Sequence, residues 1–579
     1  MKKILIHLII LIIVSSILRF VFLDRIPIGI GGDELDYVMN AKALVINGSD
    51  ISKQWNPFIL KTPPFEVPKA ELPYFLVAPY IGIMPLSLLH ARVPYAMYSI
   101  LFVILMYFLS LEFFKDKNKS FIIGIITAIN PWMIYFGRSS YDTPLAIYFY
   151  YLALYLILKL KNKKIFFSLI AFAIAFYSYI GTKVIYFPFL LFSTLYAGIL
   201  AGKKYAKRFL FLFLVGLIPL LYFIATLSTS PVSYRTGDLL TYSSDNISST
   251  VNYQRKLSIY TPITNILESK PVIFSEKLIE NYFGVFSTSY LFLYGENSPF
   301  ISLWFHGIFY YADAVFLLLG FCYLFATNKK LFLFLTAVIA IAPLPSLAST
   351  VGSSYSIRSS LMFPIFIIFI GLGIWYTIYF FKNRLIKIIV LIIIIGIYGI
   401  LLLNFVNIYF FRNPIYSSET FGFSGRLLAK YVSLAKNHNE KIVFIDKISK
   451  TTIPYAFKQY IFYTNGFTKN SSNIIAQDIK EDRYSFNDFS VSECPTTISA
   501  NEIFISGYQT KCAIFSKFSK TLTIPQLGDG GSIYAIYNDQ MCNAYKLNRY
   551  PSNFRISQFA VEKLSEKDFC TSFITNLNN

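Results

Sequence analysis

Three carboxylates follow a pair of glycines just after the first hydrophobic stretch of the chain. Asp33, Glu34 and Asp36 lie in the run Gly31-Gly32-Asp33-Glu34-Leu35-Asp36, in a sequence of 579 residues of which only 14% are charged. Acidic residues in the first turn of a helix satisfy free amides and complement the helix dipole, so one interpretation is a helix cap. The other is a general base that takes a proton from a substrate hydroxyl. These six residues by themselves leave both interpretations open.

The elements that position these carboxylates are membrane spans. The chain is 55% hydrophobic, and apolar runs of about 18 or more residues recur along it, each long enough to cross a bilayer. The sequence therefore predicts an α-helical polytopic membrane protein. The first run follows Met1-Lys2-Lys3 like a signal peptide, but no small-x-small cleavage site comes before Asp24, so we expect a retained helix.

The net charge of +21 is explained by topology. Lysines and arginines cluster in short breaks between apolar runs, and almost no acids accompany them. Short basic loops mark the cytoplasmic side of a membrane protein. This distribution argues against a nucleic-acid partner. The basic loops contain Lys2 and Lys3; Lys115, Lys117 and Lys119; Lys159, Lys161, Lys163 and Lys164; Lys203, Lys204, Lys207 and Arg208; Lys329 and Lys330; and Lys382, Arg384 and Lys387.

Placing every basic loop inside predicts about eleven spans, with the amino terminus cytoplasmic and the carboxyl terminus outside. One apolar run, Leu72 to Leu89, is excluded because counting it would move every later basic loop to the outside. It also contains three prolines, which suit a broken or interfacial segment. The predicted spans are 4–23, 94–114, 121–136, 143–158, 165–179, 184–200, 209–227, 303–325, 331–347, 359–381 and 386–408.

This topology divides the chain into a transmembrane core, 1–408, and an extracytoplasmic tail, 409–579. The core has two large external loops, 24–93 and 228–302. In the tail, strand-like runs at 441–446, 502–506 and 532–537 alternate with helical stretches such as 425–437. We therefore expect a soluble α/β domain there, and a multi-pass protein of the plasma (inner) membrane.

Cysteine usage is a separate indication of where the tail lies. Cys322 falls in a predicted span, whereas Cys494, Cys512, Cys542 and Cys570 all fall in the tail. An even number in a polar region is typical of an oxidising compartment. Pairing neighbours in sequence, Cys494 with Cys512 and Cys542 with Cys570, is the simplest of three pairings, and four free thiols is the alternative.

Several basic residues lie on the external side, against the positive-inside trend. Lys69 and Arg92 flank the interfacial segment, and Arg138 lies in the short turn that ends at Asp142. Lys183 and Arg358 each begin a span from outside. Snorkelling to lipid headgroups, or pairing of Arg138 with Asp142, are the simpler interpretations. An anionic partner such as a lipid phosphate is the functional one.

The order of these motifs resembles that of the C-type glycosyltransferases, and most closely the protein O-mannosyltransferase and aminoarabinose transferase group. The resemblance covers residues 1–408. It rests on Asp33-Glu34 after the first span, Lys69-Ala-Glu-Leu-Pro73, Arg92-Val-Pro94, Asn130-Pro-Trp-Met133 leading to Arg138 and Asp142, and Arg358 with Pro364. Those enzymes take a sugar from a polyprenyl phosphate on the extracytoplasmic side.

The resemblance implies catalytic roles for Asp33, Glu34 and Asp142. It also implies donor-phosphate contacts for Lys69, Arg92 and Arg358. Arg138 and Lys183 are further candidates for phosphate binding, because they too are predicted on the external side. The expected reaction transfers one sugar to an acceptor hydroxyl on a protein, lipid or glycan. A phosphate is a stable leaving group, so the chemistry needs a general base, expected to be Asp33, and positive charge near the leaving oxygen. Single displacement would invert the anomeric centre.

A divalent metal is compatible with these carboxylates, with Glu66 and His306 as further candidate ligands, and it stays unassigned. Three other functions remain open, and one of them is a structural or receptor-like protein in which the tail does the binding. A lipid-linked glycan polymerase or ligase would also have basic external loops. A membrane transporter is less well matched, because transporters keep their polar groups near mid-membrane on broken helices, whereas here they lie at one face.

Overall fold

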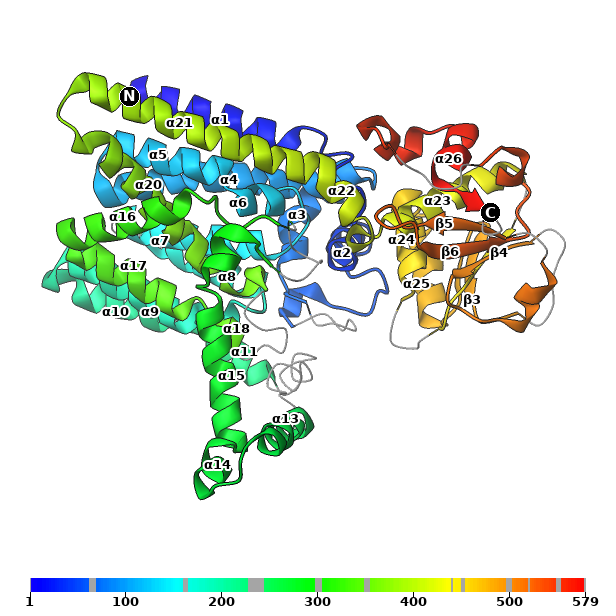
Figure 1. The fold of residues 1–579 in the computed structure, drawn as a ribbon, viewed down its shortest axis with the longest axis horizontal. Helices are drawn as coiled ribbons and strands as arrows, with labels where there is room; N and C mark the ends of the chain where they lie inside the picture. Colours follow the sequence, from blue (N-terminus) through cyan, green and yellow to red (C-terminus); the bar gives the residue numbers. More distant parts are fainter. Residues whose placement is uncertain are drawn as a thin grey trace.

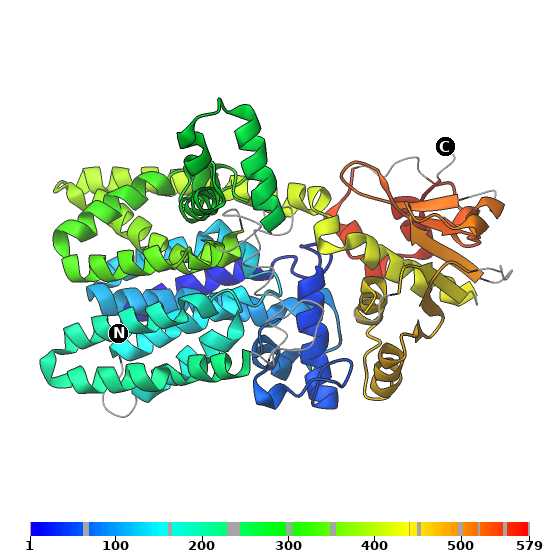
Figure 2. The same ribbon diagram turned by 90° about the horizontal axis from the view of Figure 1, so that it is seen from below.

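The computed structural model describes residues 2–61, 69–159, 165–227, 244–296, 303, 305–347, 355–438, 441–448, 453–495, 502–518, 521–547 and 553–576. Most of the helices run roughly parallel to one long axis and form a bundle (Figure 1). A domain built on a β-sheet lies beyond one end of this bundle, and the chain termini lie at opposite ends of the molecule (Figures 1 and 2).

The helices of the bundle and its loops follow the predicted hydrophobic runs closely. Their bounds are α1 Lys2–Phe20, α2 Gly32–Asn47, α3 Pro73–Ile81, α4 Leu88–Phe114, α5 Lys117–Ile129, α6 Pro131–Phe136, α7 Thr143–Lys159, α8 Phe167–Ser178, α9 Lys183–Ala201, α10 Ala206–Gly216, α11 Ile218–Thr226, α13 Ser244–Leu257, α14 Pro262–Leu267, α15 Lys270–Gly284, α16 Asp313–Thr327, α17 Lys329–Ile341, α18 Leu344–Leu347, α19 Ser356–Ser359, α20 Phe363–Phe380, α21 Arg384–Asn407 and α22 Asn413–Tyr416.

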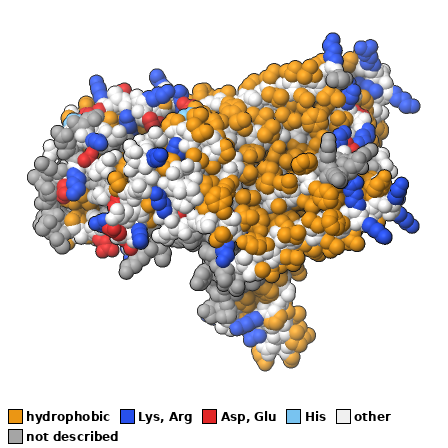
Figure 3. Space-filling model, turned by 180° about the vertical axis from the view of Figure 1, so that it is seen from behind, with side chains coloured by type: hydrophobic (Ala, Val, Ile, Leu, Met, Phe, Trp, Pro, Cys, Tyr) orange, Lys and Arg blue, Asp and Glu red, His pale blue; other side chains and the backbone are white. Residues whose placement is uncertain are grey.

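In the described ranges, seven helical segments are long and apolar enough to cross a membrane, and α7, α8 and α16 are shorter apolar helices. The predicted class of a helical, polytopic membrane protein with a carboxyl-terminal α/β domain is therefore confirmed. On the face shown in Figure 3, exposed hydrophobic side chains form a broad belt across the bundle, and Lys and Arg gather at the end remote from the sheet domain. Helix α3 has nine residues and is too short to span, as expected for the interfacial segment.

One predicted span begins later than expected. The run 303–325 forms a helix only from Asp313 onward. The residues before it pack against the π-helix η5, Ser289–Leu293, where the Phe309 amide donates to the Leu291 carbonyl. At Gly307 a side chain would come within 2.4 Å of the Phe292 carbonyl carbon. This close backbone contact replaces the first turns of the predicted helix.

The tail contains a seven-stranded mixed sheet in the order β2-β3-β1-β4-β6-β5-β7. Strand β1 is parallel to β3 and β4, and the other pairs are antiparallel. The predicted runs form β1, β4, β6 and helix α23. The bounds are β1 Lys441–Ile445, β2 Tyr484–Phe486, β3 Phe489–Ser492, β4 Glu502–Gly507, β5 Thr521–Pro525, β6 Ser532–Tyr537 and β7 Thr575–Asn576, with α23 Phe423–Ala435, α24 Tyr455–Tyr463, α25 Ser472–Lys480 and α26 Glu566–Phe573.

Two disulfides join cysteines of the tail that are neighbours in sequence. Cys494 bonds to Cys512 and Cys542 bonds to Cys570, which is the pairing that we expected. Cys322 is a free thiol on the exposed surface of the bundle.

The tail and the first external loop share one hydrophobic core. Leu35, Val38 and Met39 of α2 are buried in the same cluster as Leu427 of α23 and Phe457 of α24. Helix α2, which carries the three carboxylates, therefore packs between the bundle and the sheet domain. Figure 1 shows it at this junction.

Candidate active site

Helix α2 begins at Gly31 with a capping box that uses Glu34. One Glu34 oxygen accepts from the Gly31 amide at 3.0 Å, and the other accepts from the Ser140 amide at 2.6 Å. The side chain is fully buried, and burial raises its pKa, although Arg92 opposes the shift. Glu34 therefore positions the helix start against the turn that carries Asp142. This geometry is that of a positioning residue beside Asp33.

The two neighbouring carboxylates share one lysine. Lys69 Nζ lies 2.9 Å from Asp33 Oδ1 and 2.8 Å from Asp36 Oδ2. Burial works against the charge of Lys69, but the two carboxylates outweigh it and raise its pKa. The Asp33 side chain is 56% exposed, whereas that of Asp36 is 19% exposed. Asp33 is therefore the carboxylate of this cluster that faces open space.

A lysine of the sheet domain completes the cluster. Lys458 on α24 places Nζ 2.7 Å from Asp36 Oδ1. Burial raises the pKa of Asp36, but the ammonium groups of Lys69 and Lys458 outweigh burial and lower it overall. Two further contacts hold this domain on the same loop: the Tyr455 hydroxyl donates to the Ile30 carbonyl at 2.7 Å, and Arg426 donates to the Ile28 carbonyl at 2.6 Å.

Asp142 lies beside this cluster, at the start of α7. The Tyr37 hydroxyl donates to Asp142 Oδ2 at 2.5 Å, and the Thr143 hydroxyl donates to Oδ1 at 3.3 Å. Burial raises the pKa of Asp142 to about 6, and the negative charge of Asp33 contributes to that shift. The two aspartates expected to act together thus affect each other electrostatically. Tyr37, on the turn of α2 after Asp33, links them.

Arg92 and Arg138 occupy positions that differ from those expected of phosphate ligands. Both guanidinium groups are fully buried. Arg92 donates to the carbonyls of residues 23, 27 and 29, at 3.3 and 2.7 Å for the first two. Arg138 donates to the carbonyls of residues 18, 19 and 26 at 3.2, 2.9 and 2.9 Å, and to the Tyr409 hydroxyl. Turns without regular hydrogen bonding leave such carbonyls unpaired, and these arginines satisfy them.

Lys183 is also engaged within the protein. Its Nζ lies 2.7 and 2.9 Å from the two carboxylate oxygens of Glu71, and both side chains are at least 95% buried. The pair joins α9 to the segment just before α3. A lysine held by both oxygens of a buried carboxylate is a structural ion pair, so its charge is already balanced without a phosphate.

Arg358 retains a free donor. It lies on the short helix α19, with its guanidinium 5.1 Å from the centre of the Tyr355 ring. Its Nη1 is buried and has no hydrogen-bond partner among the described residues. Burial is the largest cause that raises the pKa of Tyr355. Tyr179 and Asp33 add smaller contributions, and Arg358 opposes the shift. The charges of Asp33 and Arg358 therefore have opposite effects on the pKa of the Tyr355 hydroxyl.

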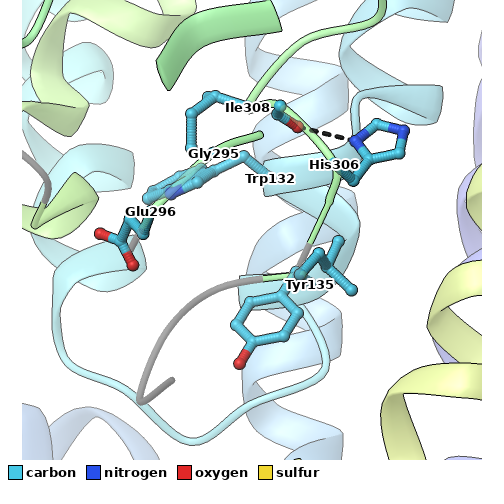
Figure 4. Close-up of a pocket in the computed structure, with 8 residues that line it drawn as sticks. Trp132, Tyr135, Gly295, Glu296, His306 and Ile308 are labelled. Atoms are coloured by element: carbon cyan, nitrogen blue, oxygen red, sulfur yellow. Dashed lines mark hydrogen bonds between the residues drawn. The ribbon is translucent and has the colours of Figure 1, made fainter. Parts of the chain in front are cut away.

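Glu296 holds the chain segment that carries Arg358. One of its oxygens accepts from the Ser356 amide, and the other, Oε2, is buried without a partner in the described part of the chain. Burial raises the pKa of Glu296 to about 8. It lines a cavity of about 20 Å³ with Trp132, Tyr135 and His306, which has room for about one water molecule (Figure 4).

His306 makes a polar contact within its own chain segment. Its Nδ1 hydrogen-bonds to the Gly307 carbonyl at 2.8 Å, and its ring packs against Tyr310 and Phe405. Glu66 lies outside the described residues. In the ranges that are described, no group of three or more His, Cys, Asp and Glu side chains could hold a metal ion.

Four residues that join this site were not predicted as site residues: Asp36, Tyr37, Glu296 and Lys458. Asp36 and Tyr37 carried a signal, because they lie one helical turn after Asp33 and share its face. Nothing in the sequence indicated Lys458 or Glu296, because each lies far from Asp33 along the chain.

No family model and no curated protein sequence matches the chain. Among solved structures, the chain is similar to the archaeal oligosaccharyltransferase AglB from Archaeoglobus fulgidus in complex with an inhibitory peptide and a dolichol-phosphate, with 10% identity over 93% of this chain and 74% of that chain and a TM-score of 0.45. It is also similar to ArnT from Cupriavidus metallidurans bound to undecaprenyl phosphate, with 11% identity over 91% of this chain and 97% of that chain and a TM-score of 0.49. ArnT is an aminoarabinose transferase, from the group that the sequence motifs resemble.

Proposed function

We propose that this protein is a glycosyltransferase that moves one sugar from a polyprenyl-phosphate donor to an acceptor hydroxyl, outside the membrane. The observation that carries the proposal is the exposed carboxylate of Asp33, which is held by Lys69 and lies on the same helix as Tyr37, the hydrogen-bond partner of Asp142. A lipid-borne donor can reach such a site from the bilayer, and an acceptor can reach it through the exposed side of Asp33.

Asp33 is the proposed general base. It accepts the proton of the acceptor hydroxyl while that oxygen attacks the anomeric carbon, and the bond from this carbon to the phosphate oxygen breaks. The electron pair leaves with the polyprenyl phosphate. This single displacement inverts the anomeric centre. Lys69 fixes the direction of the Asp33 carboxylate through Oδ1.

Asp142 is proposed to orient the acceptor or to support Asp33 electrostatically. Its carboxylate is fixed by Tyr37 and Thr143, so it presents a defined acceptor atom next to the base. Because its pKa is about 6, it is mostly ionised above that pH.

Arg358 is the proposed phosphate ligand. Its unpartnered Nη1 is a donor that a phosphate oxygen would satisfy, and a guanidinium matches phosphate geometry. Lys69 adds positive charge at Asp33. Arg92, Arg138 and Lys183 are proposed to act indirectly, because carbonyls or Glu71 already engage most of their donors, although Nε of Arg92 is buried without a partner among the described residues.

The proposal places α2 and the sheet domain outside the membrane and the amino terminus in the cytoplasm. The acceptor remains a hydroxyl on a protein, a lipid or a glycan. The two disulfides of the sheet domain fit an oxidising compartment.

The test is turnover of undecaprenyl-phosphate-linked hexoses and pentoses by purified protein in liposomes. The substitution Asp33→Asn should lower turnover by about 100-fold or more, the usual contribution of a general base. Asp24→Asn is the matched control, because Asp24 is an exposed acid of the same loop paired with Arg25. If the Asp33→Asn protein is folded and turns over donor like the wild type, the assignment of the base is wrong.

A further inference from the structure

Three helices of the second external loop form an arm that projects sideways from the bundle. Helices α13, α14 and α15 extend from the end of the bundle nearer the sheet domain, roughly perpendicular to the spans (Figures 1 and 2). The root of the arm is attached to α17 and α18. There the Tyr282 hydroxyl donates to the Ala340 carbonyl at 2.9 Å, and the Asn281 amide donates to the Leu347 carbonyl at 3.3 Å.

Polar contacts hold the arm together beyond its root. Arg255, near the end of α13, donates to the Glu268 carbonyl at 2.9 Å and to the Asn265 carbonyl at 3.4 Å. Ser258 donates to the Gln254 carbonyl at 2.9 Å. These bonds close the connection between α13, α14 and α15 while leaving most of the arm's large apolar side chains unburied.

The apolar side chains of the arm are exposed on all three helices. Leu257, Ile259, Ile263, Ile266, Ile279 and Phe283 have exposed fractions between 57% and 89%. Ile263 and Ile266 are three residues apart on α14, and Ile279 and Phe283 are four apart on α15, so each pair shares one helix face. Soluble proteins rarely leave so many large apolar side chains in water, and such a surface marks an interaction site.

The position of these side chains indicates what covers them. In Figure 3 the hydrophobic side chains of the arm lie along one edge, on the side of the Lys- and Arg-rich end of the bundle. They are continuous with the hydrophobic belt of the spans. Basic side chains of the arm lie on the opposite edge, toward the sheet domain. The belt is the surface that contacts lipid, so the arm continues a membrane-facing surface.

We propose that the arm, residues 247–284, lies in the outer interface of the bilayer with its apolar edge among the phospholipids. Interfacial amphipathic helices bury such a face roughly 5–10 Å into the boundary between headgroups and acyl chains. The partner is therefore phospholipid, and the arm fixes the depth and tilt of the bundle's external end. This inference does not depend on the reaction that the protein catalyses.

The test uses single cysteines in the full chain carrying Cys322→Ser, because the other four cysteines form disulfides. Leu257→Cys, Ile263→Cys and Ile279→Cys are labelled with a fluorophore, and the protein is reconstituted alone into phosphatidylcholine and phosphatidylglycerol vesicles. Lys256→Cys and Glu280→Cys are matched controls, because each lies one residue, or about 100° of helix, from a test position.

Phospholipids with a nitroxide near the top of the acyl chain should quench the labels at 257, 263 and 279 about twofold or more relative to the labels at 256 and 280. A water-soluble quencher should give the reverse order. If the lipid quencher acts equally on test and control positions, or the water-soluble quencher reaches 263 freely, the proposal is wrong. Protection from both quenchers would instead indicate contact with a second copy of the protein, and would also overturn it.

Discussion

The end of the bundle next to the sheet domain contains two sets of charged side chains that differ in their partners. Arg19, Arg92 and Arg138 are fully buried, and each donates to backbone carbonyls of other segments. The cluster of Asp33, Asp36, Lys69 and Lys458 consists of ion pairs between side chains, and one member, Asp33, is more than half exposed. The first set fixes the backbone, and the second leaves one carboxylate exposed.

The difference follows from the chemistry of the two cations. A guanidinium remains charged and spreads five donors over a plane, so one arginine can satisfy several carbonyls of an irregular loop. An ammonium is a compact charge that can lie between two carboxylates. Basic residues on the external side of a membrane protein therefore need not bind an external anion, because a long loop of irregular backbone offers its own acceptors.

Replacing a buried arginine should have the largest effect and should act on stability. Arg92→Met leaves three buried carbonyls without their donor, which costs on the order of 3 kcal/mol or more. Thermal unfolding in detergent measures the loss. Arg25→Met, in the same loop but partly exposed, is the control. An Arg92→Met protein that unfolds at the wild-type temperature but no longer binds undecaprenyl phosphate would restore Arg92 to the phosphate site.

Replacing Lys69 should act mainly on turnover. Lys69→Met removes the cation between Asp33 and Asp36, and the expected loss is about 100-fold, as for other fixed charges near a reacting centre. The unfolding temperature of the Lys69→Met protein, compared with that of the Arg92→Met protein, distinguishes the ion-pair cluster from the buried arginines. If Lys69→Met destabilises the protein as strongly as Arg92→Met does, the cluster is a structural feature and the distinction between the sets fails.

The pH dependence of Asp142 should be visible in both rate and stability. Its pKa of about 6 in the folded protein lies above the ordinary value of 3.8, so the folded state retains a proton that the unfolded state releases. The stability contributed by this group is present below pH 3.8 and is lost as the pH rises to about 6. Turnover should rise over the same range as the carboxylate ionises.

Asp142→Asn should abolish both pH trends, because an amide does not titrate in this range. The unfolding temperature and the turnover, each measured from pH 4 to pH 8, report the two trends separately. Trends that persist in the Asn variant would have to come from another group, and Asp142 would then lose its proposed supporting role.

Replacing Lys458 should have the smallest effect. Lys458→Met leaves Asp36 with Lys69 as its remaining ion-pair partner among the described residues, and a partly exposed pair contributes about 1 kcal/mol at most, or roughly fivefold in turnover. Lys458→Arg should retain most activity, and Lys480→Met, on the exposed side of the same domain, should behave as wild type. A loss as large as that of Lys69→Met would show that the sheet domain controls the base directly.

The elements of this protein were largely predictable. Long apolar runs, basic loops and alternating strand patterns indicated the helices of the bundle and β1, β4 and β6, because these patterns depend on local periodicity. The helix predicted at 303–325 begins late because Gly307 and Phe309 contact the backbone of η5, a contact that local hydrophobicity does not encode. The candidate site was predictable in part, since Asp33 and Asp142 lie close to spans whose order can be counted.

The sequence by itself determined that carboxylates and basic residues gather at one end of a set of membrane spans, because charge and hydropathy decide which segments enter the bilayer. Only the tertiary structure decided which of them are available. Arg92 and Arg138 have the same residue type and the same predicted side as Arg358, yet carbonyls engage them. Lys183, predicted on the same side, is engaged by Glu71. Lys458 reaches Asp36 from a distant domain. Hydrogen-bond partners are set by the three-dimensional course of the backbone, and no local pattern records it.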